Sequence, residues 1–293
     1  MSDQAQKLRE MAQAAGVRPS MPSKTAGRTG TCTSIAVTSG KGGVGKTTLS
    51  VVLAASIANE GKKVLLMDAD LGLANVNILL GISPRFNISH VISGECAISD
   101  IIVEAAPGVC LAPGASGLEK LANLDAGRLE RLRMDFMGLE SQYDYLLMDT
   151  GAGIGTMVTG FARYADLVAL VITPDPSSMA DAYAMVKVLY EKGSDNIAVV
   201  VNNIANEREG HEAFGRLNQL VVKFLKKPVE LYAILPNDRD VQRLGRKQAH
   251  LSGQAEGSRF YGLVAMLARK IVRGGPAAGA GGGFFGRLFG KGG

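Results

Sequence analysis

One stretch, Gly40 to Leu49 (GKGGVGKTTL), constrains this chain more than any other segment. It fits the pattern G-x-x-x-x-G-K-[ST], in which glycines let backbone N–H groups wrap around an anion. The preceding run, 34–39, is apolar like a buried strand, and residues 49–59 are alanine-rich and apolar like a helix. Strand, glycine loop and helix form the context in which this pattern binds phosphate at a helix N-terminus. The alternative is a glycine-rich turn that binds nothing.

Each position of the loop has an expected task. Lys46 would reach the β- and γ-phosphates, and the hydroxyl of Thr47 would bind Mg²⁺. Lys41, directly after the first glycine, is a second lysine that the general pattern does not require. It narrows the class of protein from nucleotide-binding proteins in general to a particular kind of ATPase. The expected nucleotide-binding residues of the loop are Gly40, Lys41, Gly42, Gly43, Val44, Gly45, Lys46, Thr47 and Thr48. We therefore expect ATP or ADP, together with Mg²⁺, as the ligands.

Apolar runs alternate with helical stretches along the body of the chain. The runs with the length and composition of strands are 34–39, 63–68, 109–112, 145–149, 167–172, 196–201 and 230–235. Several are apolar nearly throughout, which is typical of strands that are covered on both faces. The alternation predicts an α/β fold with a doubly wound, mainly parallel sheet flanked by helices on both faces, as in P-loop NTPases. Ligands of such sheets bind at the carboxyl ends of the strands.

Acidic residues end two of these runs and would therefore face the phosphate site. One run ends in Asp68-Ala69-Asp70, and Asp70 is the candidate for positioning the water that attacks the γ-phosphate. Asp68 would support the metal and Lys46. Asp149 ends another run and would hold Mg²⁺, through water, with Asp70 as a second acidic residue near the metal. For the Asp68–Asp70 segment, a capped turn after a strand is the alternative.

Three further segments follow strand-like runs. The sequence TGAGIG at 150–155 predicts a loop that changes shape when the γ-phosphate leaves, with a rigid turn as the alternative. Asn202 could hydrogen-bond the edge of adenine, because an amide offers a donor and an acceptor together; an ordinary turn residue is the alternative. Pro236 and Asp238 are similarly placed to shape the base pocket.

Composition excludes some classes of protein and leaves others open. The 293 residues carry a net charge of +5, which is compatible with an anionic ligand, a nucleic acid or an acidic membrane surface. Cys32, Cys96 and Cys110 form no C-x-x-C pair, which argues against a carrier of metal clusters. Neither a membrane-spanning run nor the pattern of a secretory signal is visible in the sequence, so we expect a cytoplasmic protein.

Composition also divides the chain into a body and two end segments. Residues 1–15 are expected to form a helix, followed by a flexible linker at 16–33. The body spans 34–273. A glycine- and alanine-rich linker, 274–283, leads to a terminal piece at 284–293.

The terminal piece can place its apolar side chains on one face of a short helix. These side chains are Phe284, Phe285, Leu288 and Phe289, with Arg287 and Lys291 to the side. Burial of each stabilises by about 1.5–3 kcal/mol, while ordering the chain costs about 1–2 kcal/mol per residue. One such tail should bind lipid marginally, and two tails on one dimer should bind with avidity. The alternative is that the tail packs on the protein's own surface.

Taken together, these motifs resemble those of the MinD/ParA-type ATPases. The resemblance covers 34–273 and rests on 41–48 (KGGVGKTT), 68–73 (DADLGL), 149–153 (DTGAG) and Asn202. It implies an ATP-dependent homodimer in which two subunits sandwich two ATP molecules. Lys41 would reach across to the partner's phosphates, so that Lys41, Lys46 and Asp70 are the catalytic candidates. Val52 is a departure, because relatives commonly carry Asn there.

Within that family the chain is most similar to the flagellar number regulators of the FlhG group, also called FleN or YlxH. The segment Asp3–Arg9 (DQAQKLR) fits the N-terminal motif of that group. The resemblance implies that residues 1–15 stimulate FlhF, a GTPase of the SRP type, and that a FleQ-like transcription regulator or a component of the flagellar C-ring is a further partner. A frayed helix without a partner is the alternative.

The same resemblance implies a location and leaves two other roles open. Residues 284–291 would bind an acidic membrane, so that the ATP-bound protein lies at the inner face of the cell membrane. No specific nucleic acid is expected as a partner. A division-site regulator of the MinD type, or a DNA-partitioning ATPase of the ParA type, is the alternative function.

Overall fold

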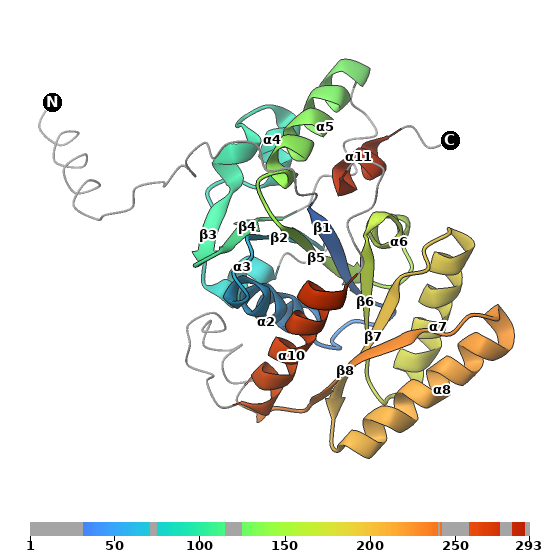
Figure 1. The fold of residues 1–293 in the computed structure, drawn as a ribbon. Helices are drawn as coiled ribbons and strands as arrows, with labels where there is room; N and C mark the ends of the chain where they lie inside the picture. The colour runs from blue at the N-terminus through green and yellow to red at the C-terminus, as the bar shows by residue number, and fades with distance from the viewer. Residues whose placement is uncertain are drawn as a thin grey trace, which may run out of the picture.

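The computed structural model describes residues 32–70, 75–114, 125–239, 241, 258–275 and 283–290. One eight-stranded sheet lies between two layers of helices (Figure 1). Every strand pair is parallel except β3 with β4. The predicted fold class, a doubly wound and mainly parallel sheet, is confirmed.

The strand positions follow the apolar runs of the sequence. The strands are β1 (Thr33–Ser39), β2 (Val64–Ala69), β3 (Val103–Ala106), β4 (Val109–Ala112), β5 (Tyr145–Ala152), β6 (Leu167–Ile172), β7 (Ile197–Ile204) and β8 (Glu230–Pro236). Their order in the sheet is β3-β4-β2-β5-β1-β6-β7-β8. All the predicted strands exist, whereas β3 was missed. It has only four residues, all at least partly exposed, so no apolar run marks it in the sequence.

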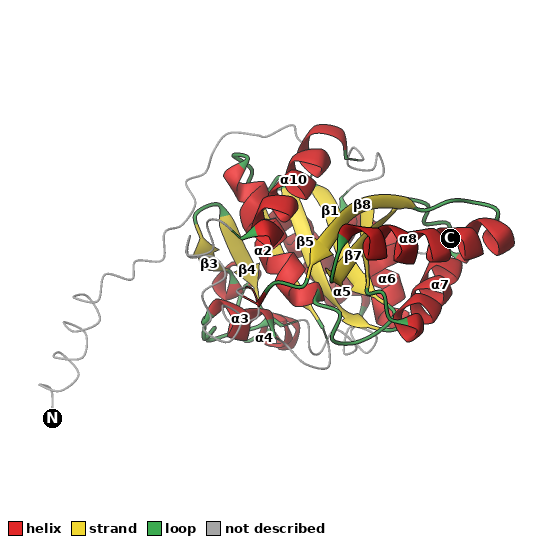
Figure 2. Cartoon of the chain, turned by 90° about the horizontal axis from the view of Figure 1, so that it is seen from below, coloured by secondary structure: helices red, strands yellow, loops and turns green. Residues whose placement is uncertain are grey.

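Helices cover both faces of the sheet, as Figure 2 shows. They are α2 (Lys46–Asn59), α3 (Val76–Leu80), α4 (Ile88–Ser93), α5 (Ala126–Glu140), α6 (Thr156–Tyr164), α7 (Pro176–Glu191), α8 (Glu207–Leu225), α10 (Arg259–Gly274) and α11 (Phe284–Phe289), with a 3₁₀ helix, η1, at Ile98–Ile101. The buried side chains of α2, α3 and α10 pack on one face, and those of α4 to α8 and α11 pack on the other. None of the helices in the described part of the chain combines the length and the apolar character needed to cross a bilayer.

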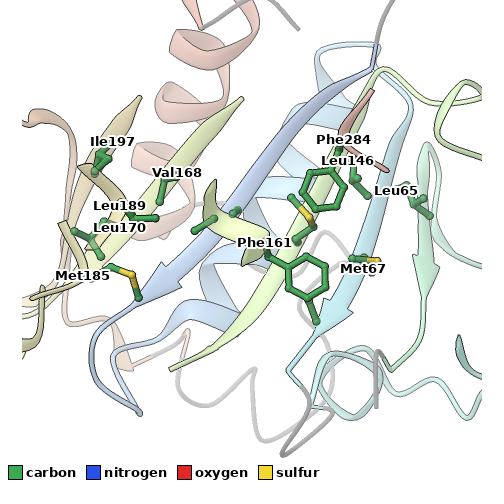
Figure 3. Close-up of a cluster of buried hydrophobic side chains, with 14 of the residues drawn as sticks. Leu65, Met67, Leu146, Phe161, Val168, Leu170, Met185, Leu189, Ile197 and Phe284 are labelled. Carbon is green, nitrogen blue, oxygen red and sulfur yellow. The ribbon is translucent and has the colours of Figure 1, made fainter. Parts of the chain in front are cut away.

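Two apolar cores result, one on each face of the sheet. Leu65 and Met67 of β2 belong to the core on the α5–α6 side, and Leu66, between them, belongs to the core under α2. Figure 3 shows the first of these cores, in which Phe161 of α6 and Phe284 of α11 pack beside the strands. Because alternate side chains enter opposite cores, each central strand is apolar at nearly every position.

The order of the strands reverses around β1. From β1 the chain moves to β2 on one side, and after β5 it crosses to β6 on the other side of β1. In the sheet, Val37 of β1 and Asp68 of β2 both pair with Asp149 of β5. The carboxyl ends of these three strands therefore meet at the topological switch point, where open α/β sheets bind ligands.

Candidate functional site

The glycine loop connects β1 to α2 and has the backbone of an anion-binding turn. Gly45, immediately before α2, has a φ of 92°, a left-handed conformation that glycine adopts without strain. A side chain at Gly45 would also collide with the amide of Asn202. Helix α2 then begins at Lys46, so its free N–H groups face the loop. This geometry is suited to a phosphate at the helix N-terminus.

Lys46 is buried beneath the loop and faces acidic neighbours. Its Nζ donates to the Oγ of Ser39 at 3.0 Å, and that hydroxyl donates to the carbonyl of Lys41 at 2.6 Å. Burial lowers the pKa of Lys46, whereas the charges of Asp149 and Asp70 raise it. The structure thus brings together three residues that the sequence assigned to one site, and it adds Ser39 as the hydroxyl that holds Lys46.

Asp149 is buried at the carboxyl end of β5. Its carboxylate accepts hydrogen bonds from the hydroxyls of Thr47 and Ser50, the latter at 3.0 Å from Oδ1. Burial raises the pKa of Asp149 to about 7, and nearby Asp68 adds to the increase. A divalent cation would reverse this effect, because its charge favours the ionised carboxylate. Thr47 and Asp149 therefore lie together, as binding of one Mg²⁺ ion requires.

Asp68 and Asp70 lie on the neighbouring strand end. The Oδ atoms of Asp68 accept from the backbone N–H of Asp70 at 3.2 Å and of Val76 at 3.1 Å. Burial raises the pKa of Asp68 to about 6. Asp70 is half-buried and lies beside Gly151, where a Cβ would come within 3.3 Å of Oδ1 of Asp70. The candidate catalytic carboxylate therefore faces the glycine segment that was predicted to change shape.

A cavity of about 410 Å³ continues from the loop toward the carboxyl ends of β7 and β8. Its lining includes Thr48, Asn202, Pro236 and Asp238, which the sequence assigned to nucleotide binding, together with Phe260 of α10. Asn202 donates through Nδ2 to the carbonyl of Val44 at 2.8 Å, so part of its amide supports the loop. Asp238 accepts from the Oγ of Ser258 at 2.5 Å, which ties the pocket rim to the start of α10. The lining combines apolar side chains, among them Val44, Val241 and Phe260, with polar groups that could fix the orientation of a ligand.

These residues fit ATP and Mg²⁺ in their chemistry. The loop offers N–H donors and the Lys46 ammonium to phosphates, Thr47 and Asp149 offer oxygen ligands to Mg²⁺, and Asp70 offers a carboxylate to water. Val52 does not contribute, because its side chain is buried in the apolar core under α2. The departure at Val52 is thus a packing feature of the helix interior.

Residues 284–289 of the terminal piece form α11, which lies against α5 and α6, on the opposite edge of the sheet from the loop (Figure 1). Phe284 and Phe285 are at most 2% exposed to solvent. The Phe284 ring stacks on Phe161 at 5.9 Å between centroids, and the Phe285 ring lies 4.6 Å from that of Phe136. This is the alternative that the sequence left open for the tail, in which it packs on the protein's own surface.

Polar contacts hold the tail at the start of α11 and at Arg287. The two carboxylate oxygens of Glu140 accept from the N–H groups of Phe284 at 2.6 Å and Phe285 at 3.2 Å, and burial raises the pKa of Glu140. Arg287 donates to the carboxylate of Asp166 at 2.8 Å and to the carbonyl of Tyr164 at 3.0 Å. Glu140 thus occupies the helix N-terminus and Arg287 pairs with a buried acid, so charged groups of the body match polar groups of this segment.

Several contributors to these sites carry no sequence signal. No motif marks the side chains of Ser39 and Ser50 as parts of a site, and Glu140 and Asp166 lie far from the tail in sequence. The predicted helix at 1–15 and most of the linker at 16–33 lie outside the described residues, as do 276–282 and 291–293.

Comparison with known proteins gives a consistent result. A family model described as an AAA domain matches residues 32–199. The antiactivator FleN of Pseudomonas aeruginosa is 39% identical over 215 residues, which cover 73% of this chain and 77% of FleN. The flagellum site-determining protein YlxH of Helicobacter pylori is 39% identical over 240 residues, which cover 81% of each protein.

Solved structures show the same fold. MinD in the MinC:MinD cell division complex of Aquifex aeolicus superposes with a TM-score of 0.67 at 27% identity, over 82% of this chain and 96% of the other. The septum site-determining protein MinD of Pyrococcus horikoshii, solved with Mg-ADP, superposes with a TM-score of 0.66 at 23% identity, over 83% of this chain and 96% of that chain. At that identity the second likeness concerns the fold alone.

Proposed function

Because this chain belongs to the MinD/ParA family of P-loop ATPases, we propose that it is an ATP-dependent pairing switch that regulates the number and placement of flagella. The flagellar part rests on its similarity to FleN and YlxH. The switch part rests on the geometry of the loop.

The observation that carries the proposal is the meeting of Lys46, Asp70 and Asp149 below a loop that also bears Lys41. ATP supplies the phosphoryl group. Thr47 and Asp149 would hold a Mg²⁺ ion, which would neutralise charge on the phosphates, and Asp70 orients water. Lys41 of each subunit reaches the partner's nucleotide, so pairing completes the site and hydrolysis ends the pairing.

The partners follow from the flagellar role. Residues 1–15 act on an SRP-type GTPase, FlhF, and a FleQ-like transcription regulator or a C-ring component reads the paired state. A regulator of this kind produces an assembly state rather than a chemical product. Its ATPase rate therefore determines how long the pair lasts.

Membrane attachment is the second output that we propose. In the described state Phe284 and Phe285 are already buried, so moving them into lipid replaces one apolar environment with another and yields little net free energy. A single tail should therefore remain in its groove. Two tails held together by a pair gain effective concentration at the membrane, so ATP favours attachment through pairing.

The pairing proposal is tested with an Asp70→Ala variant, which should bind ATP but not hydrolyse it. Sedimentation velocity should show a dimer with Mg-ATP and a monomer with Mg-ADP. A dimer of equal stability with both nucleotides would remove the γ-phosphate from the mechanism. Chelation of Mg²⁺ with EDTA should return the ATP sample to monomer.

The flagellar role is tested by deleting the gene in its own organism and counting flagella by electron microscopy. An altered number or position, restored by the wild-type gene but not by Lys41→Gln, supports the role. Normal flagella with misplaced division septa would favour a MinD-type role. DNA binding that falls steeply with salt would favour a ParA-type role.

Membrane attachment is tested by sedimentation with anionic phosphatidylglycerol vesicles. The Asp70→Ala protein should pellet with Mg-ATP and stay in the supernatant with Mg-ADP. Replacing Leu288 and Phe289 by Asp, at positions that are only partly buried, should abolish pelleting. Equal pelleting with both nucleotides would separate the tail from the switch.

A further inference from the structure

The side chain of Lys41 is turned back onto its own subunit. Its Nζ forms an ion pair with Oδ2 of Asp175 and donates to Oγ of Ser177 at 2.6 Å. Both acceptors belong to the N-terminus of α7, which lies 134 or more residues away in sequence. Two of the three N–H donors of the Lys41 ammonium are therefore directed at acceptors of its own subunit.

The acceptors of Lys41 are held in place by α7. Asp175 is the N-cap of the helix, and its Oδ1 accepts from the N–H of Ser177 at 3.4 Å. The hydroxyl of Ser177 also donates to Oδ2 of Asp175 at 3.0 Å. The positive end of a helix repels an ammonium group, so the Asp175 carboxylate is what makes this position favourable for Lys41. In return, the hydrogen bond from Lys41 lowers the pKa of Asp175.

Lys41 can leave this position without any movement of the backbone. The Lys41 and Asp175 side chains are 41% and 45% exposed, and they border an open cavity of about 370 Å³. By contrast, the start of the loop is fixed, because Gly40 packs so tightly on the backbone of Asp181 that no side chain would fit. The ammonium group is therefore the mobile part of an otherwise rigid contact between the loop and α7.

We propose that Asp175 and Ser177 retain Lys41 within its own subunit and thereby set how readily ATP drives pairing. The inference rests on the proposed function, in which Lys41 reaches the partner's nucleotide. Each pair requires two Lys41 side chains to leave Asp175, so the retention acts twice on the pairing equilibrium. Asp175 is in this sense a positioning residue that opposes premature pairing.

An opposite role for Asp175 predicts an effect of opposite sign. If Asp175 instead aimed Lys41 toward the partner, removing its charge would weaken pairing. If the contact were incidental, as many exposed ion pairs are, removal would change nothing. The sign of one measured change therefore decides between retention and the other two roles.

The decisive variant is Asp175→Asn in the full-length Asp70→Ala protein. Asn caps a helix as well as Asp does, so α7 should stay intact while the charge is lost. Exposed ion pairs typically shift an equilibrium by about two- to fivefold, which over two lysines becomes about four- to 25-fold. Sedimentation equilibrium with saturating Mg-ATP should show a dimer dissociation constant lowered by that factor. Affinity of the monomer for Mg-ADP should not change.

A second readout tests the retention without any nucleotide. In the monomer, acetylation of Lys41 by a water-soluble ester, followed by mass spectrometry, should be about two- to fivefold faster in Asp175→Asn than in the parent. Ser177→Ala should change both readouts in the same direction by less. Asp125→Asn, at the N-cap of α5, removes the same charge from the same kind of position and should change neither.

The outcomes test the retention of Lys41 separately from the proposed ATP-dependent pairing. Unchanged acetylation, or unchanged or weaker pairing, in Asp175→Asn overturns the retention while the ATP-dependent pairing of the parent still stands. A parent that remains monomeric with Mg-ATP overturns both. Stronger pairing together with faster acetylation, and neither effect in Asp125→Asn, supports the retention.

Discussion

The buried charged groups at the two ends of the parallel strands, called here the carboxyl edge and the amino edge of the sheet, differ in how they are satisfied. At the carboxyl edge, three aspartates and two lysines surround a glycine loop, and the cavities beside them open to solvent. At the amino edge, Glu140 and Asp166 are buried as Asp68 and Asp149 are, yet the backbone and Arg287 of the tail satisfy both of them. Both edges join residues that lie far apart in the sequence. Only at the amino edge does another segment of the chain, α11, occupy the site and satisfy the buried charges.

The difference shows how one fold can combine an open site for a nucleotide with a terminal helix that is already docked. Burial raises the pKa of Asp149 to about 7 although Lys46 lies nearby, and a bound cation would favour the ionised carboxylate at that edge. The amino edge is complete as it stands, and its tail has to be displaced before it can act elsewhere. Variants at the two edges should therefore fail in different ways.

The largest effect is expected at the carboxyl edge, from Asp70→Ala. Losing the group that orients water should lower ATP turnover by about 10²- to 10⁴-fold, while ATP still binds because the loop and Lys46 are intact. Phosphate release and equilibrium binding of a fluorescent ATP analogue measure the two quantities. Turnover within a few-fold of wild type would assign the reaction to another group.

Lys41→Gln should sharpen the comparison by separating pairing from binding. The loop keeps its glycines and Lys46, so the affinity of the monomer for Mg-ADP should change little. ATP-driven dimer formation should be lost, because no ammonium group reaches the partner. Isothermal titration and sedimentation velocity give the two readouts, and a dimer of normal stability would contradict the role of Lys41.

At the amino edge, Phe285→Ala should release the tail and leave the body folded. Removing a buried Phe from a core costs about 3–5 kcal/mol, but the loss of global stability is capped by the free energy of docking the tail. Hydrogen exchange of the amides at 284–289 should accelerate sharply while β1 and β5 stay protected. Phe289→Ala, at a less buried position, serves as the matched control with a smaller effect. Unchanged exchange would mean that the aromatic contacts do not hold α11.

Glu140→Gln should give the smallest effect. The amide keeps one oxygen acceptor but offers N–H groups where the second acceptor stood, so one hydrogen bond of about 1 kcal/mol is lost. Exchange at Phe284 and Phe285 should rise by about fivefold. ATP turnover should equal that of wild type, since Glu140 lies on the other edge. A change in turnover would show that the two edges are coupled in the monomer.

Much of the fold could be predicted from the sequence because its signals are local. Apolar runs marked every central strand, and glycines with a lysine marked the loop, since both patterns lie within about ten consecutive residues. β3 escaped because four partly exposed residues leave no run. Asp149 and Asp70 could be assigned to the site because strand ends in a parallel sheet share an edge.

The contacts that hold Lys41 and the tail join residues that lie far apart in the sequence. The partner of Lys41 lies 134 positions away, and Glu140 meets Phe284 across 144 positions, so neither pairing leaves a pattern in the chain. Whether the tail is free or docked also depends on the packing of α5 and α6, which together present Phe136, Phe161 and Glu140 to α11. Residue spacing along the chain sets which chemistry is available, because strands and turns form over a few residues. Packing alone sets which charges meet, because it brings together surfaces that no short segment contains.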